Sequence, residues 1–87
     1  MTNIQKARNL GANWANSMFN DFVEHPEYRG EKFEWKNFPR IASDLAASSC
    51  FLHFRCGVKR LSKLKKVCEV ACEKQCKKLI KTLNENQ

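Results

Sequence analysis

The chain has few residues that break helices or build loop-rich scaffolds. Its 87 residues include three Gly and two Pro, and no apolar run approaches the roughly 18 residues that a membrane-spanning helix needs. It also lacks internal repeats and low-complexity segments. Because 43% of the residues are hydrophobic, a small apolar core can form. We therefore expect one folded domain over residues 1–87, with no membrane span.

Recognisable catalytic motifs are also missing. The only histidines are His25 and His53, and the sequence contains no H-E-x-x-H, no G-x-S-x-G and no glycine-rich phosphate loop. Cys56 follows a basic residue, Arg55, which could lower the pKa of its thiol, but the sequence shows no pattern that assigns a base to it. The sequence therefore predicts a protein that is not an enzyme and carries no cofactor.

A disulfide framework is not indicated either. The chain has five cysteines, an odd number that cannot pair completely within one molecule. Its start, MTNIQKARNLGANW, is amphipathic and does not have the pattern of a secretory leader. We therefore expect thiols in a reducing compartment and a cytoplasmic protein.

The first segment has the hydrophobic period of a helix over about residues 3–25. Thr2 and Gln5 have the spacing of a capping box at its start, and Pro26 disfavours helical geometry at its end. Gly11 lies inside the apolar stripe, which indicates that another backbone passes close to it. The stripe covers an arc of roughly 120° and consists of Ile4, Ala7, Leu10, Gly11, Trp14, Met18 and Phe22.

An aromatic-rich connection over residues 26–38 leads into a second helix over about residues 39–56. Asn37 is suited to cap this helix, and Gly57 to end it. The second helix is apolar on two sides, which indicates either a central position in the bundle or one half of an interface with a partner. The first side consists of Phe38, Ile41, Leu45, Leu52 and Cys56. The second side, which would form the interface, consists of Ala47, Cys50, Phe51 and Phe54.

The third helix is predicted over about residues 58–83, which gives an all-α fold, a small three-helix bundle. Its cysteines at positions 68, 72 and 76 continue a stripe of leucines, so packing in the core accounts for their spacing. A zinc site is the alternative for this cluster. Because Cys68 and Cys76 are about 12 Å apart along a helix, one ion cannot bind both. The workable zinc ligands would be His53 and Cys56 together with a pair such as Cys68 and Cys72, or Cys72 and Cys76.

Positive charge is concentrated in the last third of the chain. Residues 1–56 carry seven Lys and Arg against six Asp and Glu, a net charge of +1, whereas residues 57–87 carry nine against three, a net charge of +6. Eight of these nine basic residues fall within roughly 120° of the third helix, and we call them the basic face. The basic face consists of Lys59, Arg60, Lys63, Lys66, Lys74, Lys77, Lys78 and Lys81.

Such a face indicates a binding module that contacts nucleic acid or an acidic surface of a nucleic-acid-handling protein. A solvated face that keeps the protein soluble is the plainer interpretation of the same lysines. The leading alternative function is a protein–protein adaptor or inhibitor that uses the Phe51/Phe54 side of the second helix, with a second copy or a host protein as partner. The small size and basic charge also fit an accessory protein of a phage or mobile element.

Overall fold

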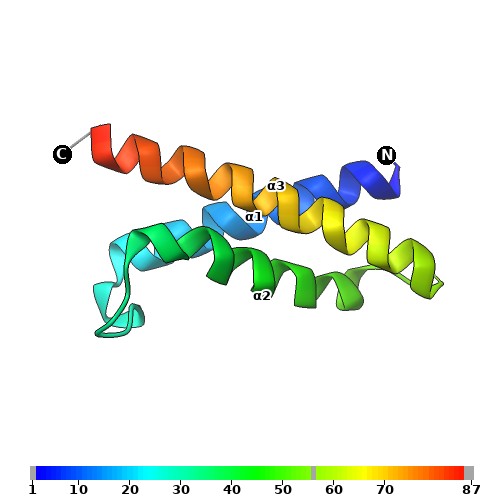
Figure 1. The fold of residues 1–87 in the computed structure, drawn as a ribbon, viewed down its shortest axis with the longest axis horizontal. Coiled ribbons are helices and arrows are strands. Elements are labelled where there is room, and N and C mark those ends of the chain that lie inside the picture. The colour runs from blue at the N-terminus through cyan, green and yellow to red at the C-terminus, as the bar shows by residue number, and fades with distance from the viewer. Residues whose placement is uncertain (1, 56, 86–87) are drawn as a thin grey trace.

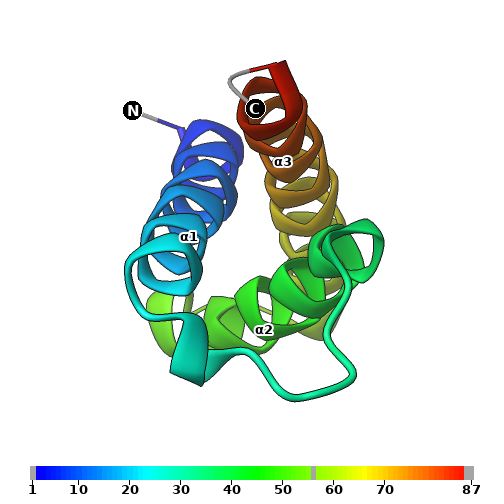
Figure 2. The same cartoon turned by 90° about the vertical axis from the view of Figure 1, so that its left-hand side faces the viewer.

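The computed structural model describes residues 2–55 and 57–85, and it is an all-α bundle in which three helices pack against one another (Figure 1). The helices are α1 (Asn3–Glu24), α2 (Phe38–His53) and α3 (Val58–Glu85). Two short 3₁₀ turns, Pro26–Tyr28 and Trp35–Asn37, shape the connection between α1 and α2. The predicted fold class is therefore confirmed. Viewed along the long axis, α1 and α3 stand side by side, and α2 lies across one side of this pair (Figure 2).

The ends of α1 follow the chemistry of its sequence. The backbone N–H of Gln5 donates to the Thr2 hydroxyl at 3.2 Å, and the Thr2 N–H donates to the Gln5 side chain at 3.1 Å. This capping box satisfies two amides that a helix start would otherwise leave without partners. At the other end, Pro26 follows His25, whose N–H donates to the Asp21 carbonyl as the last helical bond. The helix therefore ends at Glu24, one residue before the predicted end.

The close contact between α1 and α3 is made by small residues. Ala7, Gly11 and Ala15 are the buried residues of α1. Figure 1 shows that α3 crosses α1 near the middle of the bundle. A Cβ added to Gly11 would overlap the carbonyl oxygen of Cys68 and lie 3.0 Å from the amide nitrogen of Cys72. The two backbones therefore touch, as the position of Gly11 predicted, and only glycine fits there.

Large aromatic rings fill the end of the core where α1 finishes and α2 begins. Phe38 is fully buried at the start of α2, and its ring centroid lies 5.4 Å from that of Phe22 and 5.3 Å from that of Trp35. Phe19 and Phe33 complete the group, which we call the aromatic cluster. The rings meet edge-on or tilted, the arrangements that aromatic pairs favour. The connection is thus held in place by its own aromatic side chains.

Two predictions about the ends of α2 are wrong. Asn37 makes no side-chain cap, because its own backbone is already helical and continues from the preceding 3₁₀ turn. The helix ends at His53, before the predicted residue 56, because Phe54 takes an extended conformation that turns its ring into the core. The Cys56 position lies outside the described residues. The third helix continues two residues past its predicted end, to Glu85.

The side of α2 that faces the core lies between the two apolar sides that the sequence indicates. It takes Phe38 from the first side, Ala47 and Cys50 from the second, and Ala42, Ala46 and Ser49 from neither. Leu45 and Leu52 of the first side are 46% and 85% exposed, and Phe51 of the second is 57% exposed. The space between α2 and the α1–α3 pair is narrow, and alanine and cysteine fit it where leucine would overpack it.

Candidate nucleic-acid interface

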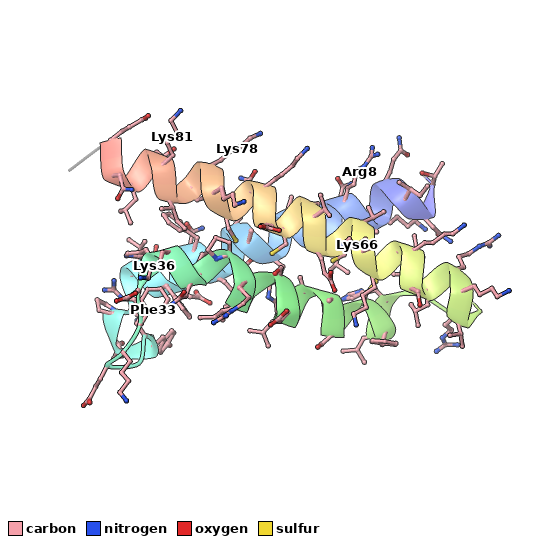
Figure 3. All side chains as sticks on the ribbon, in the orientation of Figure 1. Arg8, Phe33, Lys36, Lys66, Lys78 and Lys81 are labelled. Carbon is pink, nitrogen blue, oxygen red and sulfur yellow. The ribbon has the colours of Figure 1, made fainter. Side chains whose placement is uncertain are left out.

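All eight residues of the basic face are exposed on α3, at the side away from its buried cysteines. Because α3 continues without a break from Val58 to Glu85, the rigid helix fixes the spacing of these cations. Lys59 and Lys81 are separated by about 33 Å along the helix axis. In Figure 3, Lys78 and Lys81 project from the outer edge of the bundle. The structure therefore places the predicted residues in one row along α3, which is interrupted between Lys66 and Lys74, where the exposed Val70 lies.

Few acidic side chains neutralise this row. Among the described residues, only Lys77 of the basic face forms an ion pair, with Glu73 at 3.1 Å. Both partners are at least half exposed, so the pair contributes only a few tenths of a kcal/mol, about 0.3–0.5. The other seven cations have no acidic partner in the part of the chain that the structure describes. Their mutual repulsion favours the approach of a polyanion.

Lys65, the basic residue left out of the basic face, lies on the side of α3 next to α2. Its Nζ is 5.9 Å from the centre of the Phe51 ring, a cation–π distance. Lys65 thus has a local structural role, and its separation from the other eight basic residues of α3 agrees with the sequence pattern.

Arg8 of α1 is a basic residue that the sequence-based prediction missed. It lines a hollow of about 390 Å³ together with Lys66 and Lys74, which brings a cation of α1 beside the basic face. Figure 3 shows Arg8 along the same outer edge as Lys78. Arg8 directly follows Ala7 of the buried stripe, so its position at the flank of that stripe was the available signal.

The cysteines of α3 are core residues. Cys68, Cys72 and Cys76 are fully buried thiols, and the Cys68 S–H donates to the Ala46 carbonyl at 3.6 Å. Burial, with smaller contributions from Cys50, Cys72 and Glu69, raises the pKa of Cys68 from 9.0 to about 12. The hydrogen bond to Cys76, together with burial, raises the pKa of Cys72. Both thiols therefore stay protonated and weakly nucleophilic at neutral pH.

The alternative zinc site finds no support among the described residues. Within residues 2–55 and 57–85, no three His, Cys, Asp or Glu side chains are grouped so that they could hold a metal ion. His53 is exposed and lines a hollow with Lys6 and Phe54, whereas Cys68, Cys72 and Cys76 are buried. Cys56, the remaining ligand considered, is not among the described residues.

The predicted protein interface on α2 requires a correction. Ala47, Cys50 and Phe54 are buried in the core, so these three residues cannot form an exposed surface. Phe51 is the exception, at 57% exposure. An adaptor function through α2 would therefore have to use the outer side of the helix, where Leu45, Phe51 and Leu52 are exposed.

Comparison with known proteins does not identify a relative: no family model, no curated protein and no solved structure matches the chain. Within the described residues, no helix combines the length and the hydrophobicity needed to cross a membrane.

Proposed function

We propose that the protein is a non-enzymatic nucleic-acid-binding module whose basic face lies against the phosphate backbone. The observation that carries this proposal is the row of eight exposed cations along about 33 Å of helix, of which only Lys77 is paired with an acid in the described chain. This length is close to one turn of a B-form duplex, about 34 Å. A rigid helix of this length can therefore contact those phosphates that face it within one turn of the duplex.

The kind of cation indicates how the surface would work. Seven of the eight residues are lysines, which act as compact point charges, whereas arginine is the residue that reads guanine with two hydrogen bonds. Contacts to phosphate oxygens position a protein on nucleic acid but carry no sequence information. The proposed binding is therefore independent of sequence and strongly dependent on salt.

The setting that we propose is cytoplasmic. Thiols such as Cys68 and Cys72 persist in a reducing compartment, and nucleic acid is available there. The small size and basic charge support an accessory protein of a phage or mobile element that acts on the nucleic-acid machinery of its host.

Salt titration of a fluorescent duplex tests the proposal. If the basic face contacts about four phosphates, raising the salt from about 50 to about 200 mM weakens binding roughly a hundredfold. Replacing Lys63, Lys66, Lys74 and Lys77 by Gln then weakens all sequences equally and flattens the salt dependence.

The matched control removes four lysines elsewhere. Replacing Lys6, Lys32, Lys36 and Lys65 by Gln changes the net charge by the same amount but leaves the basic face intact. We expect this control to keep most of the salt dependence. Equal losses in both quadruple variants would show that net charge alone matters, and the basic face would then be only a solubilising surface.

A further inference from the structure

The contact between α1 and α3 is open along one side. Two hollows follow it, and the described residues that line them come only from α1, its Thr2 cap and α3. The first, of about 390 Å³, lies between Arg8 and the middle of α3. The second, of about 350 Å³, lies between the N-terminus of α1 and Arg60. Because α2 contributes to neither hollow, this side of the helix pair is uncovered, and we call it the α1–α3 groove.

The groove has an apolar floor. Val67, Val70 and Ala71 line the first hollow, and Ile4 and Leu64 line the second. Val70 is 42% exposed and Ile4 is 50% exposed, so both present apolar surface to solvent. Contacts with phosphates would not involve these exposed apolar side chains.

The rim of the groove is positively charged. Arg8, Lys66 and Lys74 surround the first hollow, and Arg60 and Lys63 surround the second. None of the described residues that line either hollow is acidic. A complementary occupant therefore carries apolar groups along its centre and negative charges at its edges.

The apolar residues of the floor are spaced along α3 like the anchor residues of a helix that binds in a groove. Leu64 and Ala71, one from each hollow, are seven residues apart, which is about 10 Å along α3. Helices that bind in grooves anchor through residues at i, i+3 or i+4, and i+7, which have the same spacing. We infer that the α1–α3 groove binds an acidic amphipathic helix of a partner protein, which completes a four-helix bundle.

Other occupants fit the groove less well. The described lining has no aromatic side chain on which an unpaired base could stack. A second copy of this chain would offer its exposed apolar helix, α2, whose outer side carries Arg40 beside Asp44 and therefore has no acidic excess. An acidic amphipathic helix complements both the apolar floor and the positively charged rim.

Because Lys63, Lys66 and Lys74 also belong to the basic face, such a partner competes with nucleic acid for these lysines.

Synthetic peptides provide the first part of the test. The probe is a fluorescent peptide of about 18 residues with leucines at helical anchor spacing and glutamates elsewhere. The controls are a peptide of the same composition with the period scrambled, and polyglutamate. We expect the amphipathic peptide to bind at least tenfold more tightly than either control at about 150 mM salt, because only it uses the apolar floor. Equal binding of all three, or no binding at about 100 µM, would overturn the inference.

Paired variants locate the site and separate it from the proposed function. Ile4→Ser with Val70→Ser removes the exposed floor, so we expect the affinity for the amphipathic peptide to fall about tenfold while duplex binding is unchanged. The matched control, Leu52→Ser with Val58→Ser, removes two exposed apolar side chains outside the groove and should leave both affinities unchanged.

Replacing Lys77, Lys78 and Lys81 by Gln should give the opposite result, weakening duplex binding and sparing the peptide. Circular dichroism of each variant verifies that the fold is intact. Peptide binding without duplex binding would refute the proposed function and keep this inference. If Ile4→Ser with Val70→Ser left the peptide affinity unchanged, the groove would act only through its charge. That result would refute this inference but not the proposed function.

Discussion

The two halves of the core reach close packing in opposite ways. Where α1 crosses α3, the packing is made by the smallest residues, and the carbonyl of Cys68 lies against Gly11. Where α1 finishes and α2 begins, the five rings of the aromatic cluster fill the core. The first half leaves no room for an added atom, whereas the second depends on large side chains that cannot be removed without leaving a cavity.

This difference also explains the use of cysteine in α3. At a crossing where backbones touch, a residue must be small and apolar, and a buried thiol meets both needs. Cys68, Cys72 and Cys76 lie on the side of α3 that faces the small residues of α1 and α2. Their spacing of four thus reflects helix packing.

The largest effect is expected at the aromatic end, from Phe38→Ala. Phe38 is fully buried and contacts four rings of the aromatic cluster, so its removal leaves a cavity that neighbouring helices cannot close. We expect a loss of about 3–5 kcal/mol in the free energy of unfolding, measured by urea denaturation. A domain of this size has little more than that to lose, so the variant is expected to be largely unfolded.

The control for this prediction is Phe51→Ala on the same helix. Phe51 is exposed and contacts Lys65 through a cation–π interaction. We expect its removal to cost less than about 1 kcal/mol. If Phe51→Ala destabilised the protein as much as Phe38→Ala, the orientation of α2 described above would be wrong.

A smaller but still large effect is expected at the crossing, from Gly11→Ala. The added methyl group meets backbone atoms of Cys68 and Cys72, which cannot move aside without separating α1 from α3. Alanine gains up to about 1 kcal/mol in helix propensity, but overpacking exceeds this gain, and we expect a net loss of about 2 kcal/mol. Gly30→Ala is the matched control, because no atom lies within 4 Å of its added Cβ. A neutral or stabilising Gly11→Ala would show that the two backbones are not in contact.

The sequence predicted the features that depend on one helix at a time. Hydrophobic period located the three helices, the basic face and the buried position of the α3 cysteines, and Gly11 indicated the close crossing. The orientation of α2 could not be obtained in this way, because Leu45 and Ala47 belong to two sides that are both apolar. The choice between them depends on the width of the space beside α1 and α3, which is a property of the assembled bundle. Arg8 was missed for a related reason, since its proximity to Lys66 exists only after α1 and α3 pack.

The smallest effect on the free energy of unfolding is expected from alkaline pH. It arises only at the crossing, because the crossing contains buried thiols, whereas the aromatic cluster has no ionisable member. The pKa of Cys68 is raised from 9.0 to about 12, mainly by burial and further by Cys50, Cys72 and Glu69. The unfolded chain therefore loses this proton from about pH 9, whereas the folded chain keeps it until about pH 12. Between these values ionisation favours the unfolded state. The contribution of this thiol to stability is therefore fully present below pH 9, and above it the free energy of unfolding falls by roughly 1.4 kcal/mol per pH unit.

Urea denaturation at pH 8, 9 and 10 measures this slope, and Cys68→Ala should reduce it by the contribution of one proton. An unchanged slope in Cys68→Ala would mean that this thiol is not held protonated by the fold, and that the crossing is more open to water than its packing implies.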